Sequence, residues 1–410
     1  MSSASRVVMK FGGSSVATVD KLRQVAGQVV ARRRAGCEVV VVVSAMGDAT
    51  DRLLEQAKAV AGEPDRRELD MLLSVGERIS MALLAMAIRE AGLDAVSLTG
   101  SQSGIITTKS HARARIIEVR PFRVEDELEA GRVVIVAGYQ GVSYTREITT
   151  LGRGGSDTTA VALAAALDAE ACELWSDVDG VYTADPRVVP DATRIDVLDT
   201  EAMLALAESG AKVVHARAVE LAREEGIALY ARKTGSDAAG TVIRRDAPVS
   251  GPEVKGIAHQ TRVLELSAPA ARLPAVLDTL EALEIEPAAL EVHGERLNFR
   301  VPLSDLPDQA RLVSELETRL ETPIPTREDR GVVTAVGDGV ASRPERLSRA
   351  LAAAKAEGIS VEPSARGSDR LELRVASAEV ETLVRALHAA FSLGASASLA
   401  APLREGDSRL

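Results

Sequence analysis

The stretch that decides the fold is Val7-Val8-Met9-Lys10-Phe11-Gly12-Gly13-Ser14-Ser15, close to the start of the chain. A strand-like apolar run ends here at a lysine and two adjacent glycines, and a helical pattern follows. Glycines leave backbone N–H groups free to face an anion, and the helix directs the positive end of its dipole to the same point. The stretch therefore predicts a phosphate-binding turn with Lys10 beside it. Lys10 precedes the glycines, unlike the lysine of a Walker A loop, and the alternative for the glycines alone is a tight turn.

Further strand-like runs indicate the class of fold. Residues 39–43, 133–136 and 171–175 are short and apolar, as is typical of parallel strands buried on both faces. A helical pattern over residues 18–35 joins the first two strands of the chain into a βαβ unit. The sequence thus predicts an α/β protein with an open, mainly parallel sheet. Polar segments follow the strands, so we expect their loops to meet where such sheets bind ligands, outside the carboxyl ends of the strands.

Composition excludes several classes of function. The chain has 410 residues, 49 basic and 60 acidic side chains, and a net charge of −11, so neither nucleic acid nor an anionic membrane is an expected partner. The two cysteines and five histidines show no metal-ligand spacing, and no metal site is predicted. No apolar leader or run of about 18 apolar residues is present, which favours a cytoplasmic protein.

Two further groups of residues point to chemistry. Gly152-Arg153-Gly154-Gly155-Ser156-Asp157 combines glycines, a guanidinium and a carboxylate at an expected helix start. Arg153 is suited to binding a carboxylate through two parallel hydrogen bonds. Asp157 is either a helix cap or a functional carboxylate. Glu77 lies in an apolar helical stretch over residues 69–91 and is either solvated or the acceptor of a substrate ammonium group. Arginine and glutamate together predict recognition of an amino acid at both of its charged groups.

Four blocks in order resemble the aspartokinases of the amino-acid kinase superfamily. They are KFGGSSV at residues 10–16, SLTGSQSGIIT at 97–107, GRGGSD at 152–157 and DVDGVYTADPR at 177–187. The resemblance implies a sheet covered by helices on both faces and the phosphorylation of the β-carboxylate of L-aspartate by ATP. The acceptor carboxylate is already ionised at neutral pH, so no general base is expected.

The resemblance also implies roles for individual residues. Lys10 would supply positive charge and Asp157 would orient it, while Arg153 would hold the α-carboxylate of aspartate and Glu77 its ammonium group. Other substrate-binding positions are Ser44, Thr50, Gly154, Gly155 and Ser156. The expected ATP-binding positions are Lys10, Phe11, Gly12, Gly13, Ser176, Asp177, Tyr182, Arg187, Lys212 and Val213. Mg²⁺ is expected on the phosphates with several waters retained. His111 lies near a histidine position of the family and receives no role.

The last third of the chain carries an internal repeat. After a linker-like stretch at residues 247–252, two segments each show a strand, helix, strand, strand, helix rhythm. They resemble the paired α+β ACT domains (βαββαβ) that end aspartokinases. The predicted domains are a kinase domain at 1–246 and ACT-like domains at 253–328 and 329–410. Residues 267–274 and 292–295 depart from the family pattern, so lysine or threonine control and a purely dimerising module remain alternatives.

Two other functions stay open at this point. One is a kinase for a related small acid, glutamate or N-acetylglutamate. The other is a catalytically silent, ACT-based amino-acid sensor, against which the intact Lys10, Glu77, Arg153 and Asp157 argue. A homodimer or larger homo-oligomer through the ACT-like domains is expected, and the pathway served would lead to lysine, threonine and methionine.

Overall fold

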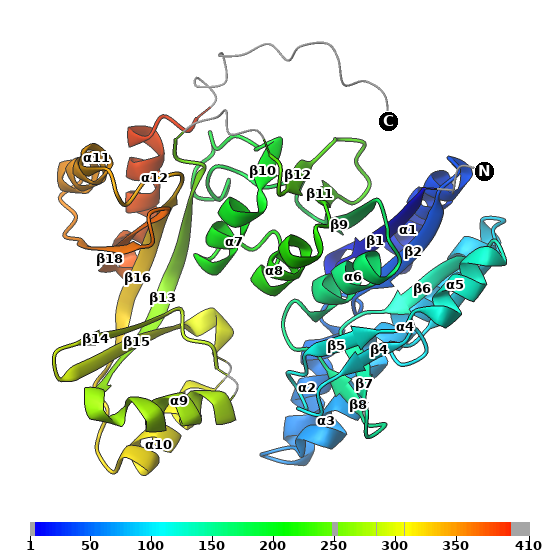
Figure 1. The fold of residues 1–410 in the computed structure, drawn as a ribbon, viewed down its shortest axis with the longest axis horizontal. Coiled ribbons are helices and arrows are strands. Elements are labelled where there is room, and N and C mark those ends of the chain that lie inside the picture. The colour runs from blue at the N-terminus through cyan, green and yellow to red at the C-terminus, as the bar shows by residue number, and fades with distance from the viewer. Residues whose placement is uncertain (1–4, 248–252, 284, 307, 395–410) are drawn as a thin grey trace. The chain divides into compact units, whose positions relative to one another are not determined.

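A computed structural model describes residues 5–247, 253–283, 285–306 and 308–394. The chain forms two compact units, whose elements are labelled in Figure 1. The first unit contains residues 1–181, 195–207 and 212–249, and the second contains residues 182–194, 208–211 and 250–410. Each unit is described by itself. The predicted domain boundaries at residues 246 and 328 remain predictions.

The first unit is built on an eight-stranded sheet. Its order is β10-β12-β11-β9-β1-β2-β6-β3, and all neighbouring pairs are parallel except β11 with β12. The order reverses at β1, which pairs with β2 on one side and β9 on the other. The strands are β1 (Arg6–Phe11), β2 (Glu38–Val43), β3 (Ala95–Leu98), β6 (Val133–Ala137), β9 (Ala171–Ser176), β10 (Val197–Asp199), β11 (Leu229–Lys233) and β12 (Thr241–Arg244). The predicted open, mainly parallel sheet is confirmed.

Burial explains why these runs become strands. Residues 39–43 of β2 are all buried, as an uninterrupted apolar run requires. In β1, Val7, Met9 and Phe11 join an apolar core that includes residues of α1 and α4, while Lys10 points to the opposite face of the sheet. The helices are α1 (Val19–Arg34), α2 (Ala49–Val60), α3 (Arg66–Leu73), α4 (Val75–Glu90), α5 (Phe122–Glu129), α6 (Gly155–Ala166), α7 (Thr200–Glu208) and α8 (Ala216–Glu225), with a 3₁₀ turn at Gly13–Ser15.

A second, smaller sheet belongs to the same unit. Its order is β5-β4-β7-β8, from strands β4 (Ile105–Thr107), β5 (Ile116–Val119), β7 (Gln140–Ser143) and β8 (Ile148–Thr150). The strand β8 leads directly into the glycine-rich loop before α6. The continuous helical stretch Arg66–Glu90 is long and apolar enough to cross a membrane by length and composition, but half of its apolar window is buried inside the protein, as in a core helix.

The second unit holds one antiparallel six-stranded sheet in the order β14-β15-β13-β16-β18-β17. Its strands are β13 (Gly256–Pro269), β14 (Ala289–His293), β15 (Arg296–Pro302), β16 (Thr326–Val336), β17 (Glu362–Arg366) and β18 (Arg370–Ala376). The helices are α9 (Leu273–Ala282), α10 (Gln309–Leu320), α11 (Pro344–Ala356) and α12 (Val380–Ala390), and they pack in two separate apolar cores. The elements follow the predicted rhythm, and the unit is consistent with two ACT-like domains.

Two predictions about this region need comment. The apolar run at residues 263–266 predicts only the middle of β13. The strand begins at Gly256, because residues 256–260 pair with β16 and bury Ile257 in the core of the second repeat. The two repeats therefore share one sheet through β13, which shifts register between Gln260 and Val263. Most of the predicted linker, residues 248–252, lies outside the described residues.

Candidate active site

Backbone hydrogen bonds join the loops that follow the central strands. The Gly138 N–H donates to the Val43 carbonyl over 3.0 Å, the Ser44 N–H to Phe11 over 3.1 Å, and the Gly12 N–H to Trp175 over 3.1 Å. These residues end or follow β6, β2, β1 and β9. The carboxyl ends of four neighbouring strands therefore lie along one edge, as the sequence predicted.

Lys10 and Asp157 meet at this edge. The Lys10 Nζ lies 2.6 Å from Asp157 Oδ1, and the two side chains are only 14% and 15% exposed. Asp157 stands in the first turn of α6, whose N-cap is Gly154 with φ +70° and without a side-chain cap. The capping interpretation of Asp157 is therefore wrong. Its carboxylate pairs with Lys10 instead.

The two glycines after Lys10 have different tasks. A Cβ on Gly13 would lie 2.9 Å from the Ala45 carbonyl oxygen, so Gly13 is required for the loop after β1 to pack on the loop after β2. A Cβ on Gly12 would meet nothing closer than Lys10 Nζ, at 3.5 Å. Protein packing thus leaves Gly12 replaceable, while its missing side chain keeps space open beside the Lys10 ammonium group.

Glu77 is buried rather than solvated. It is 3% exposed, and its Oε1 accepts a hydrogen bond of 3.0 Å from the Ala45 N–H. Its Oε2 has no hydrogen-bond partner among the described residues. Burial raises the pKa of Glu77 to about 7. The alternative of a solvated helix face is wrong, and a buried oxygen without a partner indicates a place for a ligand donor.

Ser44 lies in the loop that contacts Glu77, and Thr50 lies in the first turn of α2, directly after this loop. The Ser44 carbonyl accepts from the Ser80 hydroxyl, one turn beyond Glu77, over 2.8 Å. A Cβ on Gly76 would lie 2.7 Å from the Ala45 Cβ and 3.9 Å from Thr50 Oγ1. The end of β2, the start of α2 and the start of α4 are therefore in close contact.

The glycine-rich loop before α6 carries a free cation. Arg153 is exposed, and it has no hydrogen-bond or ion-pair partner within the part of the chain that the structure describes. Gly154 cannot carry a side chain, since its Cβ would lie 2.1 Å from the His215 ring. Ser156 is 8% exposed and packs on Gly138, whose Cβ would lie 2.8 Å from Ser156 Oγ. The loop is thus fixed on both sides of Gly155.

Comparison with known proteins agrees with this geometry. The amino acid kinase family profile matches residues 5–231. An aspartokinase of Mycolicibacterium smegmatis is 41% identical over 405 residues, which cover 95% of this chain and 96% of the relative. Aspartokinase 2 of Bacillus subtilis is 38% identical over 398 residues, covering 94% and 98%. The chain belongs to the aspartokinase family. Its fold resembles that of E. coli aspartokinase III, solved with aspartate and ADP, with a TM-score of 0.80 at 24% identity over 94% of this chain and 99% of that one.

Of the nucleotide-binding positions expected in an aspartokinase, four lie in the first unit from the end of β9 onward. Ser176 ends β9, and its hydroxyl accepts from the Val178 N–H over 3.2 Å, which shapes the turn that exposes Asp177. Lys212 and Val213 lie in the loop before α8, and Lys212 is exposed. This loop reaches the glycine-rich loop, because His215 packs on Gly154.

Two other expected nucleotide-binding positions belong to the second unit. Tyr182 and Arg187 lie in residues 182–194, where the Arg187 guanidinium is 2.7 Å from the Asp185 carboxylate. This guanidinium lowers the pKa of Asp185. The part of these two residues in an aspartokinase ATP site stays a prediction.

Sequence reasoning missed several residues that support the site. Trp175 stacks on Phe11 with ring centroids 6.0 Å apart, which fixes the end of β1 against β9. Asp70, seven residues before Glu77, is completely buried and was not singled out. A helical spacing of seven places both acidic side chains on one face, and this was the available signal.

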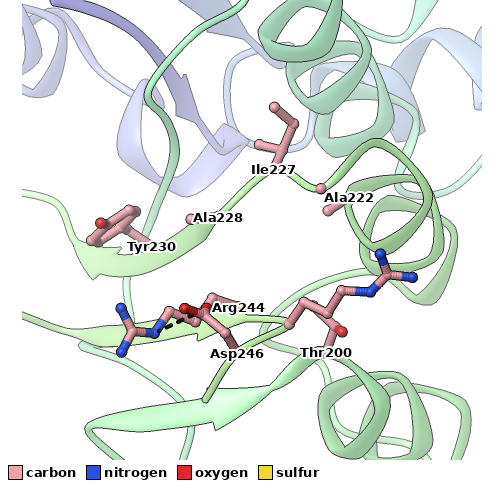
Figure 2. Close-up of a pocket in the computed structure, with 9 residues that line it drawn as sticks. Thr200, Ala222, Ile227, Ala228, Tyr230, Arg244 and Asp246 are labelled. Atoms are coloured by element: carbon pink, nitrogen blue, oxygen red, sulfur yellow. Dashed lines mark ion pairs between the residues drawn. The ribbon is translucent and has the colours of Figure 1, made fainter.

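A separate cavity of about 340 Å³ lies in the first unit (Figure 2). It is lined by the first residue of α7 and by residues of α8, β11 and β12 and their flanks: Thr200, Ala222, Gly226, Ile227, Ala228, Tyr230, Arg244, Arg245 and Asp246. Ala228 precedes β11, and Arg244 ends the antiparallel β12. The cavity therefore stands at the amino end of β11, whereas the candidate active site lies at the carboxyl ends of the strands.

Proposed function

We propose that this chain transfers the γ-phosphoryl group of ATP to the β-carboxylate of L-aspartate, giving 4-phospho-L-aspartate. The observation that carries the proposal is the Lys10–Asp157 pair at the glycine-lined edge of a sheet in a member of the aspartokinase family. The product would enter amino-acid biosynthesis, and we assign it to the start of the routes to lysine, threonine and methionine.

The chemistry needs alignment and charge rather than a base. The β-carboxylate is ionised at neutral pH, and phosphoryl transfer brings two anions together. Lys10 offers its ammonium group beside the space left by Gly12 and thereby stabilises charge on the transferred phosphoryl oxygens. Asp157 holds Lys10 in place through the 2.6 Å contact. Phe11 ends β1, and Gly12 and Gly13 form the turn that follows it, which would lie beside the phosphates.

Substrate recognition would use Glu77 and Arg153, two charged side chains of the site with no partner among the described residues for Glu77 Oε2 and for the Arg153 guanidinium. The ammonium group of aspartate supplies the donor that Glu77 Oε2 lacks, and the α-carboxylate meets the guanidinium of Arg153. Ser44, Thr50 and the loop of Gly154, Gly155 and Ser156 border the same place. Membership of the amino acid kinase family supports ATP as the donor.

Mg²⁺ is proposed to arrive on the phosphates of ATP with several waters retained. No group of three His, Cys, Asp or Glu side chains suited to a metal is found in the residues that the structure describes. Such an ion would be held by the phosphates and water rather than by a dedicated protein cage, and it would offset phosphate charge when bound. Ser176, Asp177, Lys212 and Val213 of the first unit are proposed to contact the nucleotide.

The alternatives are not favoured. N-acetylglutamate carries no ammonium group and would leave the buried Glu77 without a partner. A silent sensor has no use for the Lys10–Asp157 pair, and relatives about 40% identical over nearly the whole chain are named aspartokinases.

For the second unit we propose two ACT-like domains that join copies of the chain into a homodimer or larger oligomer, in the cytoplasm. Lysine or threonine is the proposed effector. The departures from the family pattern fall on Ala270–Arg272, the 3₁₀ turn after β13, and on the tight turn between β14 and β15. Inhibition curves with each amino acid, alone and together, test this control.

The activity is tested by trapping the acyl phosphate with hydroxylamine, which gives a hydroxamate only when ATP and aspartate are both present. Lys10→Ala should lower turnover by about a hundred-fold or more, the usual effect of removing a preorganised charge donor. Lys58→Ala removes a lysine on the outer part of α2 and is the matched control. Near-normal aspartate phosphorylation by Lys10→Ala would refute the assignment.

A further inference from the structure

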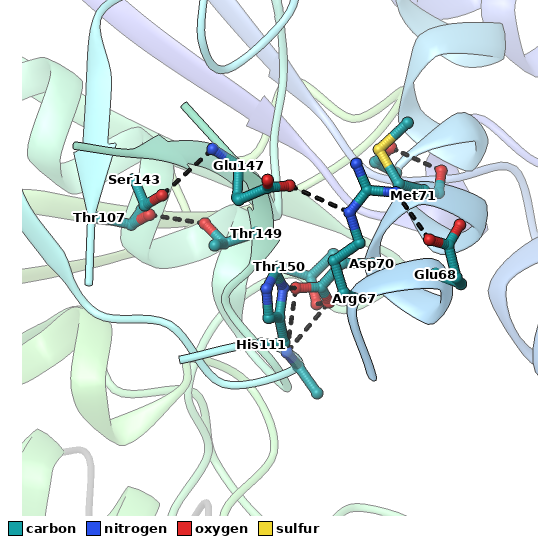
Figure 3. Close-up of polar contacts among 12 residues, drawn as sticks. Arg67, Glu68, Asp70, Met71, Thr107, His111, Ser143, Glu147, Thr149 and Thr150 are labelled. Carbon is teal, nitrogen blue, oxygen red and sulfur yellow. Dashed lines mark hydrogen bonds and ion pairs between the residues drawn. The ribbon is translucent and has the colours of Figure 1, made fainter. Parts of the chain in front are cut away.

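Asp70 is a completely buried carboxylate outside the proposed site, with three hydrogen-bond donors around it (Figure 3). Its Oδ1 accepts from the Thr150 hydroxyl over 2.6 Å and from the Ala112 N–H over 3.0 Å. Its Oδ2 lies 2.8 Å from Nδ1 of His111. The carboxylate therefore joins three elements: helix α3, the loop between β4 and β5, and the last residue of β8.

The loop that Asp70 holds is strained. Ala112 has φ +72°, a left-handed conformation that an alanine adopts only when its surroundings impose it. The loop is fixed at two further points, because the Ala114 N–H donates to the Thr150 carbonyl over 2.8 Å and the Thr108 N–H to Arg115 over 2.9 Å. The bond from the Ala112 N–H to Asp70 thus helps to impose the strained conformation.

The strained loop around Ala112 packs directly against the glycine-rich loop that carries Arg153. A Cβ on Gly152 would be 3.3 Å from Arg113 Cγ and 3.4 Å from the Ala112 carbonyl oxygen. Gly152 precedes Arg153, and Thr150 is only three residues before Arg153 in the chain. The Asp70 carboxylate therefore fixes the end of β8, which leads to Arg153. It also fixes the loop around Ala112, on which Gly152 packs.

The same helical stretch also carries Glu77. Asp70 and Glu77 are about two helical turns apart, and both are buried, at 0% and 3% exposure. The side chain of Tyr139 lies between Asp70 and Glu77, since its hydroxyl hydrogen-bonds with Thr150 and both carboxyl groups interact with it electrostatically. Burial raises the pKa of Tyr139 to about 12. The helical stretch formed by α3 and α4 thus carries Glu77 itself and contacts the segment before Arg153 through Asp70.

We propose that Asp70, His111 and Thr150 are positioning residues for aspartate. They set the separation between Glu77 and Arg153, and so place the α-amino-acid group where its β-carboxylate reaches the phosphoryl group. This inference rests on the proposed roles of Glu77 and Arg153. It gives His111 a task that the sequence left unassigned, and it predicts a defect in aspartate binding rather than in ATP binding.

The test compares two adjacent threonines of β8. Thr150→Val removes the hydroxyl that binds Asp70, whereas Thr149→Val removes an equally buried hydroxyl that pairs with Thr107 over 2.6 Å (Figure 3). Neighbouring strand residues face opposite sides, so only Thr150 contacts the Asp70 cluster. Thr150→Val should raise KM for aspartate about ten-fold or more and leave KM for ATP within about two-fold. Thr150→Ser should restore the wild-type KM, and Thr149→Val should leave both KM values unchanged.

Two further variants make the outcome unambiguous. Asp70→Asn keeps the volume but loses the charge, and it should raise KM for aspartate in the same way while thermal melting confirms a folded protein. The inference fails if Thr150→Val changes KM for aspartate no more than Thr149→Val, or if KM rises equally for both substrates. Arg153→Ala tests the proposed role of Arg153 separately. If its KM for aspartate is unchanged, Arg153 does not bind the α-carboxylate, and both that role and the inference are overturned. If its KM for aspartate rises but that of Thr150→Val does not, only the inference fails.

Discussion

The burial of Glu77 makes the free energy of unfolding depend on pH, and the variant Glu77→Gln tests this directly. The glutamine side chain would keep the acceptor for the Ala45 N–H and the volume of the glutamate, but it carries no charge. Burial raises the pKa of Glu77 from 4.5 to about 7. The folded chain therefore binds more protons than the unfolded chain between these values, and the stability that Glu77 provides at low pH is lost as the pH rises through about 7.

The magnitude follows from that shift. At pH 5 the folded carboxyl is almost entirely neutral, and at pH 8 it is almost entirely ionised. With 1.36 kcal/mol for each pKa unit, wild type loses about 2.5 kcal/mol more than Glu77→Gln between pH 5 and pH 8. The new amide N–H₂ takes the place of the unpartnered Oε2, and its effect on stability does not change with pH, so the difference between the two pH values is the informative quantity.

Urea unfolding followed by tryptophan fluorescence measures this difference. The chain contains a single tryptophan, Trp175, which lies in the core of the first unit and reports on the unfolding of that unit. The same variant should raise KM for aspartate about ten-fold or more, because a neutral amide binds an ammonium group weakly. In wild type, kcat/KM for aspartate should rise with pH around an apparent pKa of about 7, and this limb should be absent in the variant. A free-energy difference between the two proteins that stays constant from pH 5 to pH 8 would refute the reasoning.

Two other predictions concern charged groups. Arg153→Lys should raise KM for aspartate about ten-fold with KM for ATP unchanged, since lysine cannot form two parallel bonds to a carboxylate, and equal changes for both substrates would contradict the proposed role. In the second unit, Arg300 donates to Glu372, and both are 6% exposed. Arg300→Met should destabilise that unit by about 3 to 5 kcal/mol, and the double variant Arg300→Met/Glu372→Leu should recover most of the loss, as measured by circular dichroism during urea unfolding.

The sequence predicted those elements whose patterns are local. The strands β2 and β6 are uninterrupted apolar runs, and α1 has Leu22, Val25 and Val29 on its buried face with three arginines in its last turn. Such patterns follow from burial on one or both faces and need no knowledge of the rest of the chain. The carboxyl ends of β1, β2, β6 and β9 were predicted to within one residue for the same reason, and with them the edge of the sheet at which Lys10 and Asp157 meet.

Other features depended on contacts between distant segments. Whether Glu77 is solvated or buried is decided by the loop after β2, which covers it and donates the Ala45 N–H. The full length of β13 is set by its partner β16, which follows more than fifty residues later in the chain. Asp70 shares a helix face with Glu77, but its three donors come from segments that no periodicity connects.

Two charged side chains of the proposed site, Glu77 and Arg153, indicate the kind of substrate that it would bind. Lys10 is held in place by Asp157 over 2.6 Å, and its proposed partner is the transferred phosphoryl group rather than a charged group at the α-carbon of the amino acid. Glu77 has one buried oxygen without a donor, and Arg153 has a guanidinium without an acceptor among the described residues. An α-amino acid carries both an ammonium group and a carboxylate and would supply a partner to each of these side chains. In the function that we propose, the second carboxylate of aspartate would face the phosphoryl group beside Lys10, and the Asp70 cluster would set the separation of Glu77 and Arg153 that aspartate has to match.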